Sequence, residues 1–322
     1  MHRRCALKAM GMMALASSPR VLLAQSGRGV VRLVIPYAAG GQTDVIARML
    51  ANSMQRTLQR NIVVENRPGA TGMIATKYVQ SLPPDGDTLL FYNSGMMIQP
   101  MVQKSGAYDL RKELDPVAMT GIGPNVLMVH ESVPAKTVPE FLAYAKSRTD
   151  GLNCANSGIN SGGHIAAMLL EKLGDINLNH IPFKGSAEVT TALVTGQVQL
   201  QVSVTTDSLN PYIKAGKIRM LAVATKERSA LMPDIPTIGE FVPGYALDGW
   251  FGILAPAHTP AAVRELMSNA VKVALQEPAT KERFLQLYLE PRYKSPQQFE
   301  ADIAASVRNF RDTIRLLALT PQ

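Results

Sequence analysis

Two glycine-rich segments, one in each half of the chain, carry the residues best suited to bind a small ligand. They are residues 36–44 (PYAAGGQTD) and 156–164 (NSGINSGGH), and each lies between an apolar stretch and a helical pattern. Glycine lets the backbone turn sharply and approach a ligand closely, and a helix N-terminus presents unpaired N–H groups at the positive end of its dipole. Such a terminus binds an anion without a cationic side chain. Two of them facing each other would suit a ligand with carboxylates at both ends.

Each segment taken alone is equally typical of an ordinary turn or surface loop between a strand and a helix. Thr43 or Asp44 could cap the first helix. Ser161 could cap the second helix and leave the amides of Gly162 and Gly163 open to a second anionic group. The presence of both segments therefore supports the binding of an anionic ligand more strongly than either segment alone.

Two shorter segments follow predicted strands. In residues 182–187 (PFKGSA), Lys184 could add positive charge or be a solvated surface lysine, which is the commoner case. Residues 93–95 (NSG) follow the apolar stretch 88–92. The ends of parallel strands are where α/β sheets bind ligands, so both segments are candidates for the same site.

Motifs of catalysis and cofactor binding are absent from the sequence. It lacks the Gly-x-Gly-x-x-Gly and Gly-Lys-Ser/Thr patterns of nucleotide sites, the Gly-x-Ser-x-Gly elbow and His-Glu-x-x-His, and any Cys-x-x-Cys or His-rich cluster. The histidines His130, His164, His180 and His258 stand in unrelated contexts. We predict no catalytic residue, no metal and no cofactor, although a Ser-His-Asp triad assembled in space stays open.

The first 24 residues predict a secretory signal peptide. A basic start is followed by the apolar run 9–18 and by Ala24 as a small residue at the cleavage point. The run is far shorter than the roughly 20 residues of a membrane-spanning helix, and the alternative is a disordered tail. We therefore expect export to the periplasm.

Removal of this segment changes the charge and the cysteine count. It holds four basic residues and no acidic one, so the formal charge falls from +8 to +4. A modest, dispersed charge suits an anionic ligand and does not argue for nucleic acid. Cys154 is then the single cysteine, which excludes an internal disulfide. It could be a nucleophile, but a buried apolar role is more typical.

Strand-like and helix-like stretches alternate along the whole chain, which predicts an α/β architecture with mostly parallel sheets. The expected helices have apolar residues at helical spacing, and they cover residues 43–58, 72–81, 138–148 (capped by Thr137), 165–173, 188–195, 261–276 and 296–317. The 322 residues exceed one ordinary core. We expect two lobes joined by a two-stranded hinge, with crossings near residues 123–125 and 244–249.

The chain resembles the Bug-type receptors, the extracytoplasmic solute-binding proteins of tripartite tricarboxylate transporters. The segments that carry the resemblance run through nearly all of the predicted mature chain: 32–48 (RLVIPYAAGGQTDVIAR), 63–75 (VVENRPGATGMIA), 83–91 (PPDGDTLLF), 124–130 (PNVLMVH), 181–188 (IPFKGSAE), 212–223 (YIKAGKIRMLAV), 233–240 (PDIPTIGE) and 250–260 (WFGILAPAHTP).

The resemblance implies a periplasmic-binding-protein-like fold whose two lobes close on the ligand like a Venus flytrap. Lobe 1 would comprise residues 25–123 plus 249–322, and lobe 2 residues 124–248. It implies a periplasmic receptor, expected to be a monomer, that captures a small organic carboxylate for membrane transporter subunits. The implied ligand-binding residues are Tyr37, Ala39, Gly40, Gly41, Thr43, Asp44, Ser94, Ser157, Gly158, Ser161, Gly162, His164, Lys184, Gly185 and Ser203.

Departures from the family pattern bear on the identity of the ligand. Ser203 stands where the family often has an Asp that contacts an amino or amide group in some members, which disfavours an amino-acid ligand. Cys154 stands where an aromatic residue is common. Two other functions remain open on the sequence: a periplasmic sensory receptor that signals to a membrane partner, and a secreted hydrolase.

Overall fold

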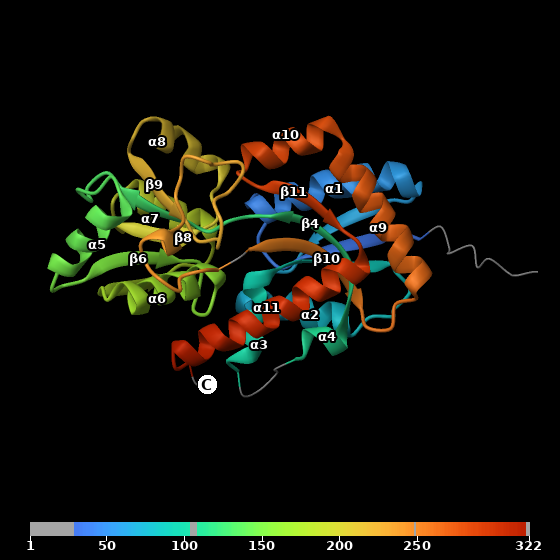
Figure 1. Ribbon diagram of the computed structural model, residues 1–322. Coiled ribbons are helices and arrows are strands. Elements are labelled where there is room, and N and C mark those ends of the chain that lie inside the picture. Colours follow the sequence, from blue (N-terminus) through green and yellow to red (C-terminus); the bar gives the residue numbers. More distant parts are fainter. Residues whose placement is uncertain (1–28, 104–107, 248, 320–322) are drawn as a thin grey trace, which may run out of the picture.

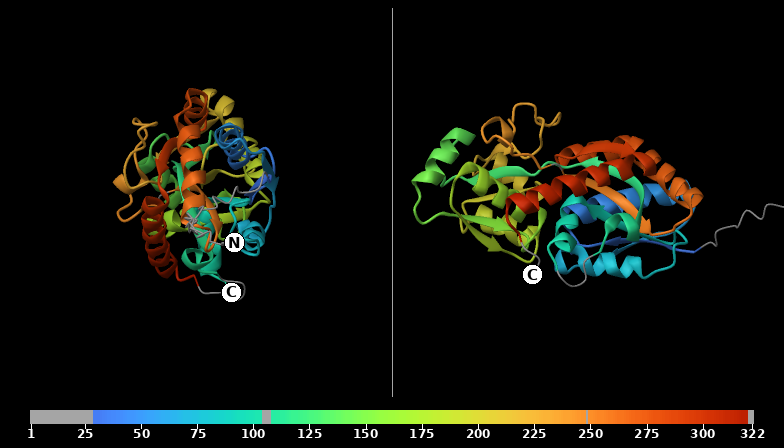
Figure 2. Two further views of the ribbon diagram at one scale, coloured as in Figure 1. Left: turned by 90° about the vertical axis from the view of Figure 1, so that its right-hand side faces the viewer. Right: turned by 60° about the horizontal axis from the view of Figure 1, so that its bottom comes forward.

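The chain folds into two α/β lobes that lie side by side (Figure 1). The computed structural model describes residues 29–103, 108–247 and 249–319, so the predicted signal peptide, residues 1–24, lies outside the described residues. Lobe 1 is here the six-stranded sheet with its helices, and lobe 2 the five-stranded sheet with its helices. Figure 2 shows the two lobes arranged along the long axis of the molecule.

Lobe 1 has the strand order β11-β4-β10-β3-β1-β2. β1 pairs in parallel with β2 and β3, and the remaining pairings are antiparallel. Because β1 and β3 are parallel neighbours, the loops that follow them leave the sheet at the same edge. The strands are β1 (Val31–Ile35), β2 (Ile62–Asn66), β3 (Thr88–Asn93), β4 (Leu114–Ile122), β10 (Trp250–Pro256) and β11 (Glu290–Lys294).

Alternation along β1 explains the layers of lobe 1. Leu33 and Ile35 are buried in one apolar cluster with side chains of α1 and α9, and Val34 is buried in another with side chains of α2 and α11. Successive residues of a strand face opposite sides of the sheet, so helices cover both faces. The lobe 1 helices are α1 (Gln42–Leu58), η1 (Ala70–Gly72), α2 (Met73–Gln80), η2 (Ser94–Met97), α3 (Ile98–Met101), α4 (Leu110–Glu113), α9 (Ala261–Gln276), α10 (Pro278–Gln286) and α11 (Pro296–Leu316).

Lobe 2 has the strand order β7-β6-β8-β5-β9. β6 pairs in parallel with β7 and β8, whereas β5 is antiparallel to β8 and β9. Its strands are β5 (Val126–His130), β6 (Leu152–Asn156), β7 (Leu178–Pro182), β8 (Leu200–Ser203) and β9 (Ile218–Val223). Its helices are α5 (Val138–Ser147), α6 (Gly162–Gly174), α7 (Ser186–Val194), η3 (Asp207–Leu209), α8 (Asn210–Lys214) and η4 (Ile238–Glu240).

Two glycines lie side by side where the chain crosses between the sheets. β4 leads into β5 through Gly123, and the chain returns to β10 through Gly249. The amide of Gly123 donates to the carbonyl of Gly249 at 3.1 Å. A Cβ on Gly249 would lie 2.3 Å from the Gly123 carbonyl oxygen, so this close approach of two backbones requires glycine there.

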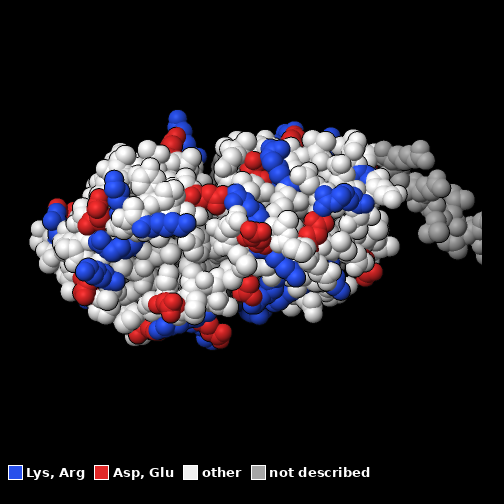
Figure 3. Space-filling view, turned by 90° about the horizontal axis from the view of Figure 1, so that it is seen from above, with Lys and Arg blue, Asp and Glu red and all other residues white. Residues whose placement is uncertain are grey.

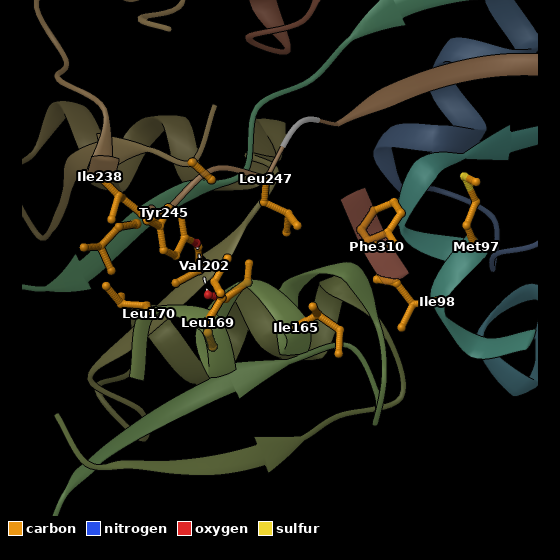
Figure 4. Close-up of a cluster of buried hydrophobic side chains, with 14 of the residues drawn as sticks. Met97, Ile98, Ile165, Leu169, Leu170, Val202, Ile238, Tyr245, Leu247 and Phe310 are labelled. Carbon is orange, nitrogen blue, oxygen red and sulfur yellow. Dashed lines mark hydrogen bonds between the residues drawn. The ribbon is translucent and has the colours of Figure 1, made fainter. Parts of the chain in front are cut away.

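A single apolar cluster continues from one lobe into the other. It includes Met97, Ile98 and Phe310 of lobe 1 and Ile165 and Leu169 of α6 in lobe 2. Figure 4 shows Ile165 on the side of α6 that faces lobe 1. The lobes therefore share buried apolar surface, which favours the arrangement in which they touch.

The predicted two-lobed α/β architecture is confirmed, with sheets that are mixed rather than mostly parallel. In lobe 1 the late return of the chain adds β10 and β11 antiparallel to the sheet, and in lobe 2 β5 lies antiparallel between β8 and β9. Thr137 caps α5 as predicted. Within the described residues, no helix has the length and apolar character needed to cross a membrane.

Candidate functional site

The first predicted segment opens directly onto the N-terminus of α1. The N-cap is Gly41, and no side chain caps the helix. The expectation that Thr43 or Asp44 caps it is wrong, because the helix already begins at Gln42 and Asp44 lies inside its first turn. Ala39 and Gly40 are exposed. The first amides of α1 thus receive no side-chain acceptor.

Asp44 holds the loop before α1 in place. Its carboxylate accepts hydrogen bonds from the Gly40 amide at 3.0 Å, from Arg48 Nε at 2.9 Å and from Asn66 Nδ2 at 2.9 Å. Burial alone would raise the pKa of Asp44, but these hydrogen bonds outweigh it and hold the pKa below its usual value. Gly40 has a φ of +86°, a left-handed conformation that suits glycine. Asp44 therefore positions the backbone whose amides could bind an anion, and Arg48 offsets the negative charge of Asp44.

Polar groups after β3 support the same loop. Asn93 Nδ2 donates to Tyr37 Oη at 2.7 Å, and burial raises the pKa of Tyr37 so that it stays a neutral phenol. The hydroxyl of Ser94, which is 3% exposed, accepts from the amide of Trp250 at 3.3 Å. These side chains connect the ends of β1 and β3 with the start of β10.

The second predicted segment precedes α6, and Ser161 caps this helix as predicted by accepting from the His164 amide at 3.3 Å. His164 Nδ1 in turn accepts from the Asn160 amide at 3.0 Å. Burial and then the neighbouring His180 lower the pKa of His164 to about 4. His164 is therefore neutral near pH 7 and stabilises the loop. Ser157 is exposed, and Gly158 has a φ of +128°.

The third segment precedes α7, whose N-cap, Gly185, also provides no side-chain cap. The exposed Lys184 donates its backbone amide to Glu188 Oε2 at 3.0 Å. Ser186 is the first residue of the helix. α7 therefore presents an N-terminus that is as open as that of α1.

The two lobes meet at two pairs of predicted loops. A Cβ on Gly41 would lie 3.7 Å from Ser186 Oγ, so α1 opens toward α7. A Cβ on Gly95 would lie 3.1 Å from Gly162 Cα, so the turn after β3 touches the start of α6. From the sequence we expected the N-terminus of α1 to face the loop before α6. In the structure it faces the N-terminus of α7 instead.

A cavity of about 170 Å³ lies between α1 and α7. Of the sequence-predicted residues only Gly40 and Gly41 line it. Gln42 and Ser186, which also line it, lie within the predicted segments 36–44 and 182–187, whereas the lining residues Thr190, Thr206 and Asp207 of lobe 2 were not predicted. Residues 206 and 207 follow β8 in the same sheet as the parallel strands β6 and β7, a position that could have indicated them.

Direct polar contacts cross from one lobe to the other beside the cavity. Gln42 Nε2 donates to the carbonyl oxygens of Thr205 at 2.9 Å and Leu287 at 3.1 Å. Thr205 Oγ1 also donates to the Leu287 carbonyl at 3.2 Å. Asp207 forms an ion pair with Arg283 of α10. These contacts hold the two lobes together.

The remaining predicted residues have local roles. The hydroxyl of Ser203 donates to the carbonyl of Val204 at 3.3 Å. Cys154 is fully buried, and burial, followed by the nearby Glu171, raises the pKa of its thiol to about 12. An unactivated thiol is a poor nucleophile. Among the described residues, no three His, Cys, Asp or Glu side chains group together in a way that could hold a metal ion.

Charges are mixed on the face seen in Figure 3, where Lys and Arg are interspersed with Asp and Glu over both lobes. Some of the exposed charged side chains of the protein form ion pairs with each other, such as Arg228 with Glu240. A binding surface for nucleic acid would instead gather basic side chains on one face.

Comparisons with known proteins agree on one family. Residues 46–319 match the model described as the tripartite tricarboxylate transporter family receptor. The periplasmic binding protein BugD is similar in structure, with a TM-score of 0.82 and 30% identity over 91% of this chain and 99% of that chain. Two proteins of Rhodopseudomonas palustris were solved with ligands. Rpa4515 with adipate has a TM-score of 0.83 and 30% identity over 91% of this chain and 98% of its own. MatC with bound malate has a TM-score of 0.80 and 30% identity over 88% of this chain and 98% of its own.

Proposed function

The chain belongs to the family of tripartite tricarboxylate transporter receptors, and we propose that it captures a small carboxylate between its lobes and presents it to transporter subunits in the membrane. The family consists of periplasmic solute-binding proteins rather than enzymes. The adipate and malate bound by two relatives support a carboxylate ligand. The proposal includes export by the signal segment 1–24 and action as a monomer.

The observation that carries the proposal is the pair of open helix N-termini that face one cavity. α1 and α7 have glycine N-caps without side-chain caps, and Gly41 and Ser186 meet across the cavity. Each N-terminus carries about half a positive charge. A carboxylate placed between them would accept hydrogen bonds from both lobes and would favour the closed arrangement.

Size and charge of the cavity agree with such a ligand. About 170 Å³ is below the range of roughly 300–1,000 Å³ typical of pockets for drug-sized ligands, so a small acid fits better. The acidic side chain at its wall, Asp207, is paired with Arg283. The approaching anion therefore meets helix dipoles and the hydroxyls of Ser186 and Thr190 rather than an uncompensated negative charge.

In this proposal the sequence-predicted residues fall into two groups. The backbone around Gly40, Gly41 and Gly185 binds the ligand. The other predicted residues position that backbone or close the site around it, and they are Tyr37, Ala39, Thr43, Asp44, Ser94, Ser157, Gly158, Ser161, Gly162, His164, Lys184 and Ser203. We further propose that the lobes, residues 25–123 plus 249–322 and residues 124–248, close as units about the contact between Gly123 and Gly249.

A thermal-shift screen of organic acids on the mature chain, residues 25–322, tests the proposal. A ligand at about 100 times its dissociation constant stabilises the folded protein by about 2.7 kcal/mol, which corresponds to a rise in Tm of roughly 5 °C for a chain of this size. We expect small carboxylates to produce this rise and their amides to have no effect. A rise with neutral or cationic solutes only would contradict the proposal.

A further inference from the structure

The turn between β2 and α2 contains four consecutive residues with positive φ. Gly69 and Gly72 have φ values of +129° and +90°, and Ala70 and Thr71 between them have values of +46° and +50°. Left-handed backbone is costly for any residue with a Cβ, and a β-branched residue such as threonine is rare there. A threonine at position 71 therefore needs a reason that lies outside the backbone.

Packing and hydrogen bonds fix this turn in place. A Cβ on Gly69 would lie 2.5 Å from Ile74 Cδ1, and a Cβ on Gly72 would lie 2.3 Å from Met96 Cε, so side chains fill the space on both sides. The amide of Gly72 donates to the carbonyl of Gly69 at 3.0 Å, and Thr76 Oγ1 donates to the carbonyl of Gly72 at 2.9 Å. Strained residues persist where their surroundings hold them in this way, and they cluster at ligand clamps and switch regions.

The side chain of Thr71 reaches across to lobe 2. Its hydroxyl donates to the Ile159 carbonyl at 3.5 Å, and a Cβ on Gly158 would lie 4.0 Å from Thr71 Oγ1. The loop that it meets is fixed as well, because the amide of Asn160, whose φ is +61°, donates to His164 Nδ1. A distance of 3.5 Å is at the long end of the hydrogen-bond range, so a small widening between the lobes breaks this contact.

Lobe 1 itself has no use for the Thr71 hydroxyl. Among the described residues, its one hydrogen bond is the one to the Ile159 carbonyl. Glycine at position 71 would remove the backbone strain and would lose no hydrogen bond within lobe 1. A residue that lowers stability without a local gain indicates a function, which here lies at the contact between the lobes.

We propose that Thr71 is a positioning residue for ligand capture: its hydroxyl holds the loop 157–160 of lobe 2 against lobe 1 and so stabilises the closed arrangement of the lobes. The inference rests on the proposed function, because this contact affects binding only if the lobes close on a ligand. Neither Thr71 nor Ile159 lines the cavity between α1 and α7. Thr71 should therefore raise the affinity for different acids by the same factor.

Isothermal titration of the mature chain, residues 25–322, and of its Thr71→Gly variant tests the inference. The probes are organic acids of two to six carbons, including succinate, malate and adipate. We expect the affinity for each acid that binds to fall about three- to tenfold in the variant, which corresponds to the loss of one hydrogen bond. The melting temperature without ligand should stay the same or rise by up to about 2 °C, because the strain is removed.

The kinetics of binding give a second measurement. Trp250 is the single tryptophan of the chain and begins β10, directly after the crossing at Gly249. Its fluorescence in a stopped-flow experiment reports on binding at this crossing. A contact of the closed arrangement slows dissociation, so Thr71→Gly should release the acid about three to ten times faster and leave the association rate nearly unchanged.

Two further variants separate the hydroxyl from the strain. Thr71→Ser keeps the hydroxyl and should recover most of the affinity that Thr71→Gly loses. Ala70→Gly removes strain at the neighbouring exposed residue and leaves the hydroxyl in place. Its melting temperature should behave like that of Thr71→Gly, whereas its affinity should stay within about twofold of the unmodified protein.

The outcomes distinguish this inference from the proposed function. Unchanged affinity in Thr71→Gly, an equal loss in Thr71→Ser or Ala70→Gly, or a lower melting temperature of Thr71→Gly overturns the role of the hydroxyl while carboxylate capture stands. Losses that differ from acid to acid would place Thr71 on the ligand and also overturn it. If no acid of two to six carbons binds the unmodified protein, the proposed function fails and this inference fails with it.

Discussion

Gly41, the N-cap of α1, and Ser186, the first residue of α7, face each other across the junction of the lobes: a Cβ on Gly41 would lie 3.7 Å from the Ser186 hydroxyl oxygen. In the sequence, the chain between the two residues runs from α1 to β4 in lobe 1 and from β5 to β7 in lobe 2. Their contact brings two uncapped helix N-termini to one cavity. Capture of a carboxylate between α1 and α7 depends on this arrangement.

Gly41→Asp should abolish carboxylate binding without unfolding the protein. The backbone at Gly41 is extended (φ −78°, ψ 167°), so aspartate fits and can cap α1 with its own carboxylate. It would occupy the place of the ligand and repel it, and we expect affinity to fall about a hundredfold or more. Titration and melting temperature measure the two effects.

Gly41→Asn is the control for this variant. It also caps the helix but carries no charge, so its loss of affinity should be clearly smaller. Equal loss in both variants would show that capping rather than charge decides binding, and unchanged affinity in Gly41→Asp would place the ligand elsewhere.

Gly95→Ala should hinder closure of the lobes. Its Cβ would lie 3.1 Å from Gly162 Cα and 3.3 Å from Gly162 N, both of them backbone atoms of the opposite lobe. Overpacking of this kind costs about 1–3 kcal/mol, which we expect to appear as a loss of affinity of about tenfold. Ala143→Ser on α5 is the control, since residue 143 is exposed on the surface of lobe 2 and is not part of the predicted site. Similar losses in the two variants would count against the contact.

His164 should make stability depend on pH between about 4 and 6.5. Burial and His180 lower the pKa of His164 to about 4 from the usual 6.5. The unfolded chain therefore binds this proton at higher pH than the folded protein, and stability is full above 6.5 and is lost as pH falls toward 4. Denaturation at a series of pH values should show a flatter profile in His164→Gln.

His258→Asn serves as the comparison for that experiment, because His258 is exposed and has a φ of +70°, which asparagine tolerates. We expect it to retain the slope of the unmodified protein. If His164→Gln has the same slope too, the proton that destabilises the protein binds at another residue.

Cys154 should resist thiol reagents in the folded mature protein. It is fully buried, and burial together with Glu171 raises its pKa to about 12, so the reactive thiolate is scarce. Labelling should proceed only at the rate of unfolding and become immediate in denaturant. Rapid labelling of the native protein would contradict this burial.

Local pattern predicted the elements whose apolar periodicity is regular. The helix expected at 43–58 is α1, found at Gln42–Leu58, and the helix expected at 261–276 is α9 with those bounds. β4 was not predicted because Pro116 and Gly121 interrupt its apolar pattern, and Pro and Gly argue against a strand. β11 was not predicted because its residues, EPRYK, are mostly polar; it lies at the edge of the sheet.

The site was predictable only in part. The α1 opening follows from the glycines beside an apolar strand, which are local features. That α7 rather than α6 lies opposite α1 depends on how the two sheets are placed, which no local pattern contains. The role of Gln42 depends on carbonyl oxygens 163 and 245 residues away in the sequence. Long-range contacts of this kind become visible only in the folded chain.

A crystal structure of the mature protein with the acid that stabilises it most is the most direct test. The account predicts one carboxylate of that acid between α1 and α7, with its oxygens about 2.7–3.2 Å from backbone N–H groups in the first turns of both helices. A carboxylate bound outside this cavity, or held by a cationic side chain with the two N-termini unoccupied, would contradict it.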